Sequence, residues 1–139
     1  MNHQVLQPAG WARPRGYSNG VCARGRQVYI AGQIGWDGQG RFHSDGFADQ
    51  VRQALENVVA VLAEAGGGAE HLTRLTWYVT NRDEYLAEMA AVGAAYREVI
   101  GKHFPAMAVV QVVALIEARA KVEIEATAVI PDVPESLQT

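Results

Sequence analysis

Apolar and polar residues recur along this chain with two different periods, which locate its main elements. Between Ala48 and Leu62 the apolar residues return every three or four positions, and charged or amide side chains fill the gaps. This spacing predicts an amphipathic helix. Gly66-Gly67-Gly68 then ends the helix, because glycine readily adopts the left-handed conformation found at helix ends. A second helix is predicted over residues 82–100, closing at Gly101.

Five segments have the β-branched and aromatic content, or the alternation, expected of strands. They are residues 16–23, 27–31, 72–80, 106–114 and 121–130. We expect Arg24-Gly25-Arg26 to form a hairpin turn between the first two strands, and Asp37-Gly38-Gln39-Gly40 to form a further turn. With another short strand before the first helix, the predicted order is β-β-β-α-β-α-β-β. This order is typical of an α+β domain with two helices packed on one sheet.

The length of 139 residues fits a single domain over residues 1–139 with one hydrophobic core. Residues 1–15 contain Pro8, Gly10 and Pro14 and are predicted to be an irregular lead-in. Residues 131–139, with Pro131 and Pro134, are predicted to be a frayed tail. No internal repeat or linker divides the sequence.

Composition and charge exclude several classes of function. Hydrophobic residues make up 49% of the chain and charged residues 19%, which is typical of a soluble globular protein. A formal net charge of -3 disfavours nucleic acid as a partner, because phosphate binding needs clustered Lys and Arg. The loose basic group of Arg13, Arg15, Arg24 and Arg26 is predicted to be solvated loop charge.

The chain has no apolar run long enough to span a membrane and no signal-peptide pattern, so we expect a cytoplasmic protein. The single cysteine, Cys22, excludes an internal disulfide and is expected to be a buried small hydrophobe. No pair of histidines has metal-ligand spacing, so no metal site is predicted. The histidines are His3, His43, His71 and His103.

Five short motifs occur in a fixed order along nearly the whole chain. They are residues 16–20 (Gly-Tyr-Ser-Asn-Gly), 30–34 (Ile-Ala-Gly-Gln-Ile), 50–57 (Gln-Val-Arg-Gln-Ala-Leu-Glu-Asn), 104–106 (Phe-Pro-Ala) and 122–128 (Val-Glu-Ile-Glu-Ala-Thr-Ala). With these motifs the chain resembles the Rid (reactive intermediate deaminase) family, also called the YjgF or L-PSP endoribonuclease-like family. The resemblance implies a chorismate-mutase-like fold, a mixed sheet and a homotrimer with small-molecule clefts between subunits. It implies no cofactor.

In the deaminase branch of that family, the clefts hydrolyse enamine or imine acids to a ketoacid and ammonia. The resemblance makes Glu123 the acid/base residue, although two exposed glutamates on one strand, Glu123 and Glu125, are the alternative reading. Tyr17 matches the position of an aromatic wall with a hydroxyl group. Gly32 and Gln33 match positions that line the substrate site, where a glycine backbone can approach a ligand closely.

Three positions depart from the pattern of the deaminases. Met107 stands where they carry the arginine that holds the substrate carboxylate, Ala31 replaces a serine, and Gly93 replaces an asparagine. A guanidinium holds a carboxylate through two parallel hydrogen bonds, and a thioether cannot. The sequence therefore predicts a more apolar cleft.

Two main functions remain open from the sequence. The first is a divergent imine or enamine deaminase, a hydrolase acting on C–N bonds of a reactive metabolite without the usual carboxylate. The alternative is a non-catalytic trimer that binds a small molecule or a partner. Endoribonuclease activity is a minor third alternative, which the acidic balance disfavours.

Overall fold

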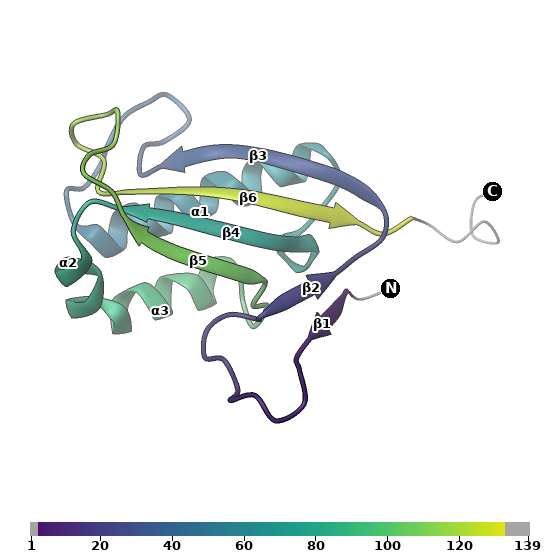
Figure 1. The fold of residues 1–139 in the computed structure, drawn as a ribbon. Helices are drawn as coiled ribbons and strands as arrows, with labels where there is room; N and C mark the ends of the chain where they lie inside the picture. Colours follow the sequence, from purple (N-terminus) through teal and green to yellow (C-terminus); the bar gives the residue numbers. More distant parts are fainter. Residues whose placement is uncertain (1–2, 133–139) are drawn as a thin grey trace.

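The structure is a computed structural model, and it describes residues 3–132 (Figure 1). In chain order its elements are β1 (Gln4–Leu6), β2 (Gly20–Cys22), β3 (Arg26–Ile34), α1 (Phe47–Glu64), a 3₁₀ turn η1 (Ala69–His71), β4 (Leu72–Val79), α2 (Arg82–Ala87), α3 (Met89–Val99), β5 (Ala106–Gln111) and β6 (Val122–Ile130). The predicted tail at residues 131–139 falls largely on residues 133–139, which lie outside the described residues.

Four strands form the main sheet in the order β3-β6-β4-β5. β4 and β5 run parallel, whereas the other neighbouring pairs are antiparallel, so the sheet is mixed. Helices α1 and α3 lie against the same face, behind the sheet in Figure 1, and no helix of residues 3–132 covers the front face. This arrangement confirms the predicted α+β fold with two helices on a mixed sheet. The predicted second helix is divided at Glu88, whose backbone leaves the helical conformation between α2 and α3.

The hydrophobic core lies between the sheet and the helices. The inward side of α1 is fully buried at Val51, Leu55 and Val58, as its three-to-four-residue period predicts. On β6 every second residue from Val122 to Ala128 is buried, so the residues between them face the open side of the sheet. Within residues 3–132, no helix combines the length and hydrophobicity needed to cross a bilayer.

The lead-in and the first turn differ from the prediction. The expected irregular lead-in contains β1, which pairs antiparallel with β2 in a separate two-stranded ribbon. The predicted hairpin across residues 24–26 is therefore wrong, because β2 pairs with β1 and β3 pairs with β6. Gly25 carries the chain from the ribbon to the main sheet with φ of 147°, where a Cβ would lie 2.1 Å from the Ile130 carbonyl oxygen. Only glycine fits this position.

Other local predictions have mixed outcomes. The turn at residues 37–40 is confirmed, since the Gly40 N–H donates to the Asp37 carbonyl at 2.9 Å. The glycine stop after α1 is also confirmed, with Gly66 at a φ of 82°. The prediction that Cys22 is buried is wrong, because it ends a strand of the small ribbon and is exposed.

Gln50 fastens the start of α1 to the segment before β6. Its side chain is fully buried, and its Nε2 donates to the carbonyls of Ser44 at 3.2 Å and Arg119 at 3.0 Å. Its Oε1 accepts the N–H of Lys121 at 2.9 Å. A buried amide that satisfies three backbone groups holds these segments in one arrangement.

We expect Gln50→Leu to lower the free energy of unfolding by about 2–3 kcal/mol, because the three backbone groups lose their partner while the volume is nearly kept. Gln39→Leu, at an exposed turn position, is the matched control and should change stability by less than about 0.5 kcal/mol. Urea unfolding followed by circular dichroism measures both. Equal stability of the two variants would contradict the assigned role of Gln50.

Candidate functional site

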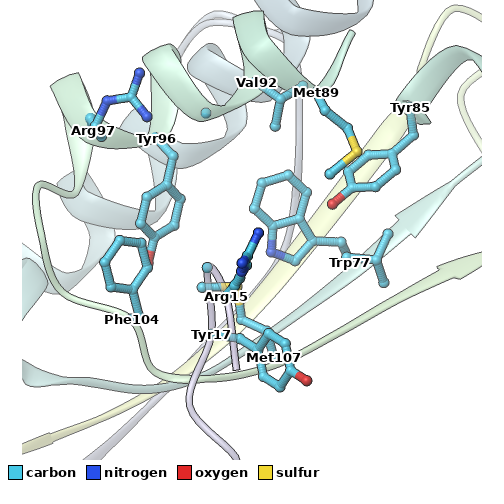
Figure 2. Close-up of a pocket in the computed structure, with 13 residues that line it drawn as sticks. Arg15, Tyr17, Trp77, Tyr85, Met89, Val92, Tyr96, Arg97, Phe104 and Met107 are labelled. Atoms are coloured by element: carbon cyan, nitrogen blue, oxygen red, sulfur yellow. The ribbon is translucent and has the colours of Figure 1, made fainter. Parts of the chain in front are cut away.

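A cleft of about 570 Å³ opens between α3 and β5, within the size range of small-molecule sites (Figure 2). Its lining is mainly aromatic and apolar. The lining residues are Arg15, Gly16, Tyr17, Trp77, Tyr85, Met89, Val92, Gly93, Tyr96, Arg97, Phe104, Met107 and Val109. The cleft contains three of the sequence-predicted site residues, namely Tyr17, Gly93 and Met107.

Ser18 positions the segment that forms one side of the cleft. Its N–H donates to the Pro105 carbonyl at 3.0 Å, and its Oγ donates to the Phe104 carbonyl at 2.5 Å. Ser18 is buried and bridges to Ala106 at the start of β5. These bonds fix the preceding residues beside β5, where they reach the cleft.

Aromatic pairs form the walls of the cleft. Trp77 and Tyr85 meet edge to face with ring centroids 6.5 Å apart, and Tyr96 stacks on Phe104 at 5.5 Å. Burial raises the pKa of the Tyr85 and Tyr96 phenols, so both remain neutral at neutral pH. The Tyr96 hydroxyl donates to the His103 carbonyl at 2.5 Å and is thereby occupied. The walls offer ring surfaces and no base.

Two cations reach this apolar cleft. Arg15 comes from the segment before Tyr17, and Arg97 comes from α3. Neither arginine takes part in an ion pair found among residues 3–132. Gly93 lies one helical turn before Arg97, and a Cβ placed on it would meet the Arg97 Nη1 at 3.4 Å. The missing side chain at Gly93 leaves room for the guanidinium.

One further donor lies in the wall without a partner. The Trp77 side chain is 3% exposed, and its indole Nε1 is a buried nitrogen with no hydrogen-bond acceptor. Figure 2 shows this nitrogen on the edge of the ring that faces Arg15 and Met107. Buried N–H groups are nearly always paired in folded proteins, so this one stands out.

The remaining predicted site residues gather on β3 and β6. The Glu123 carboxyl lies directly over Gly32, where a Cβ would come within 2.6 Å of the carboxyl carbon. Only a glycine permits this approach. The register of β3 on β6 shifts between Ile30 and Gln33, which places Ala31 and Gly32 in a bulge. Gln33 donates from Nε2 to the Ala31 carbonyl at 3.0 Å.

A single chain does not bring the cleft and the Glu123 side chain together. Met107 pairs with Leu75 on the core side of the sheet, whereas Glu123 lies between buried Val122 and Ile124 and faces the open side. β3 and β5 also form the opposite edges of the sheet. The Glu123 group and the cleft therefore lie on different faces of one molecule.

Sequence reasoning missed most of the cleft lining. It treated Arg15 as solvated loop charge and did not consider Arg97, although the i, i+4 spacing from Gly93 was a signal for the latter. Trp36, next to the turn at residues 37–40, packs on Phe42 with ring centroids 5.9 Å apart and is outside the cleft lining. Across residues 3–132, no three His, Cys, Asp or Glu side chains are placed to hold a metal ion.

Comparison with known proteins gives consistent matches over most of the chain. The profile of the family described as Endoribonuclease L-PSP matches residues 11–130. A human protein named 2-iminobutanoate/2-iminopropanoate deaminase is 33% identical over 114 residues, which cover 81% of this chain and 79% of the human protein.

Solved structures give the same result. A Yersinia pestis protein of unknown function in the conserved Rid protein family, YyfB, superposes with a TM-score of 0.83 and 32% identity, covering 94% of this chain and 100% of that chain. E. coli TdcF with bound serine is similar at a TM-score of 0.65 and 30% identity, covering 91% and 98%. The chain is therefore similar to these proteins in both sequence and fold.

Proposed function

Because the chain belongs to the Endoribonuclease L-PSP family, which includes the Rid proteins, we propose that it hydrolyses a small imine or enamine in clefts between the subunits of a homotrimer. The placement of Glu123 carries this proposal. Its carboxyl lies over Gly32 on the open face, and it takes part in no ion pair found among residues 3–132. Such a carboxylate is free to exchange a proton with water.

The reaction needs one acid/base group, one water molecule and a surface that holds the substrate. Glu123 takes a proton from the water as its oxygen adds to the carbon of the C=N bond. This proton passes to the nitrogen and gives a carbinolamine. The proton of the new hydroxyl then passes to the nitrogen as the C=O bond forms, the C–N bond breaks and ammonia leaves. An enamine first takes a proton at its β-carbon and loses one from its nitrogen, which makes it the imine. Tyr17, half-exposed at the cleft, supplies an aromatic wall and a hydroxyl that can orient the substrate.

The open face of the sheet supports assembly. It carries exposed apolar side chains, including Tyr29 at 72% exposure and Val110 at 44%, and no helix of the described chain covers it. In a closed ring, the open face of one copy would bring its Glu123 beside the cleft of the next copy. Head-to-tail contacts of this kind generate rings when the rotation closes. The proposed trimer thereby unites the two groups that one chain keeps apart.

The substrate is expected to have an apolar body. The walls consist of aromatic rings and thioethers, and Met107 cannot make the bidentate contact of an arginine. Two substrate classes fit this cleft. One is a neutral imine without the usual carboxylate, as the sequence predicts, and the other is an imine whose acid is held elsewhere in the cleft.

Imine decay in the presence of an oxidase tests the proposal. An amino-acid oxidase acting on phenylalanine supplies an imine with a carboxylate, and an amine oxidase acting on benzylamine supplies a neutral one. Semicarbazide, present from the start, condenses faster with the imine than with the carbonyl product. Catalysed hydrolysis therefore lowers the early yield of semicarbazone, which is the yield to be measured. We expect the protein to lower the semicarbazone yield from at least one of the two imines. An unchanged yield with both imines would reject the hydrolase.

A non-catalytic binding trimer is the second candidate. It is favoured by the loss of polar side chains at Ala31, Gly93 and Met107, relative to the pattern of the deaminases. A ligand that binds the folded state raises the melting temperature by mass action. Thermal stabilisation by a ligand, together with an unchanged semicarbazone yield, would support this candidate over the hydrolase.

Restoring the usual arginine gives a gain-of-function prediction. We expect Met107→Arg to increase the hydrolysis of the small imine made from alanine by about tenfold, because a bidentate contact to its carboxylate is restored. Met107→Leu is the matched control and should show no gain. The oxidase assay measures both. A Met107→Arg variant that folds and gains nothing would show that position 107 does not face the substrate.

A further inference from the structure

The charged side chains that line the cleft are all positive. Arg15 and Arg97 bring two positive charges, and the residues that line the cleft include no aspartate or glutamate. The whole chain has a formal net charge of -3, so this concentration of positive charge is local. An apolar site with cations and no acid favours a ligand that carries a negative charge.

The two arginines approach the cleft from different elements. Arg15 is held next to β5 through the hydrogen bonds of Ser18, and Arg97 projects from α3 over Gly93. Figure 2 shows Arg97 above the Tyr96 ring and Arg15 lower in the cleft, beside the indole. Both arginines therefore line the same cleft, one from α3 and one from the segment before Tyr17.

The unpartnered Trp77 nitrogen is an independent sign of the same ligand. It is a buried donor, so its binding partner must be an acceptor. Of the two labelled side chains that it faces in Figure 2, Arg15 has only donors and Met107 offers at most a weakly accepting sulfur. The nitrogen has almost no accessible surface, so a neighbouring side chain must shift before a carboxylate oxygen reaches this N–H. The new bond would then remove the cost of leaving the N–H unpaired.

We propose that Arg15, Arg97 and the Trp77 Nε1 form an anion site that holds the carboxylate of an aromatic acid, in place of the arginine missing at position 107. The rings of Tyr17, Tyr96 and Phe104 contact the aromatic body of this ligand. Resting on the proposed function, this site assigns the substrate class as 2-imino acids with an aromatic side chain. It replaces the sequence-based prediction of a substrate without the usual carboxylate.

Binding of a stable acid and its neutral isostere tests the site without turnover. The probes are 3-phenylpropanoate and 3-phenylpropanamide, measured by isothermal titration calorimetry on the full chain. We expect the wild type to bind the acid at least about tenfold more tightly than the amide, and to lose this preference as salt is added. Equal affinity for acid and amide would overturn the anion site.

Three variants show which arginines cause the preference for the acid over the amide. Arg15→Met and Arg97→Met should each reduce the affinity for the acid by about tenfold and leave that for the amide within about twofold. Arg13→Met, an exposed arginine two residues from Arg15 and outside the cleft lining, should keep the full preference. Retention of the preference in both cleft variants would overturn the proposal.

Trp77→Phe keeps an aromatic ring in the wall but removes the pyrrole part of the indole, including the N–H, so affinity for the amide is measured in parallel to account for the lost ring volume. It should weaken binding of the acid by several-fold, and the circular dichroism melting curve should show that the variant is folded. Unchanged affinity in the folded variant would remove Trp77 from the site.

The failures of the two proposals can be told apart. Tight, arginine-dependent binding of the acid with no effect on imine decay would reject the hydrolase and keep the anion site. Accelerated decay of the benzylamine imine, with equal affinity for acid and amide, would keep the hydrolase and reject the anion site.

Discussion

Glu123→Gln is expected to lower the acceleration of imine hydrolysis by about 10²–10³-fold, because glutamine cannot take a proton from water. The carboxyl lies on the open face, next to Gly32, and is not part of the core. The melting temperature should therefore stay close to that of the wild type. Semicarbazone yield at several protein concentrations gives the rate, and circular dichroism gives the melting temperature.

Glu125→Gln is the matched control on the same strand and the same face. The Glu125 Oε1 accepts the Tyr78 hydroxyl at 2.6 Å, and a glutamine can still accept that bond. This variant should retain most of the activity. Equal losses in the two variants, or a fully active Glu123→Gln protein, would show that Glu123 is not the acid/base group.

Gly32→Ala is expected to reduce activity by about 10–100-fold while leaving the fold intact. A Cβ at position 32 would lie 2.6 Å from the Glu123 carboxyl carbon and 2.9 Å from Oε1, which is too close, so the carboxyl must move. The displaced atoms belong to the end of a flexible side chain, so the cost in stability is small. Misplacing a catalytic group by about 1 Å can cost on the order of 10²-fold in rate.

Gly38→Ala provides the control for a new methyl group. Its Cβ would meet nothing within 4 Å, so neither activity nor melting temperature should change beyond the error of the measurement. If Gly32→Ala matches Gly38→Ala in activity, the close approach of Gly32 to Glu123 has no role in catalysis.

The sequence predicted the main sheet and helices well because their periods are set by burial. The buried side of α1 and the alternation along β6 follow directly from one face meeting the core. The pairing of β2 with β1 was missed, because the choice of partner strand depends on contacts between segments distant in sequence. The backbone approach of Gly25 to Ile130 is such a contact, and no local pattern reveals it.

From the sequence, candidate site residues can be predicted mainly within or next to the five motifs. The motifs predict site roles for Tyr17, Gly32, Glu123 and Met107, but they give no account of the arginines that line the cleft with Tyr17 and Met107. Arg15 reaches the cleft because Ser18 fastens its segment to β5, and that bond joins residues 86 positions apart. Met107, in place of the arginine of the deaminases, therefore does not show by itself whether the cleft has lost its positive charge.

Mixed assemblies of two variants test whether each site joins the cleft of one copy to Glu123 of another. Glu123→Gln and Tyr17→Ala chains are each expected to be nearly inactive alone. Co-expressed in equal amounts, they should recover about a quarter of the wild-type activity per chain, because in a closed ring about one site in four combines an intact cleft with an intact glutamate. A mixture no more active than its separate components would contradict a site shared between copies.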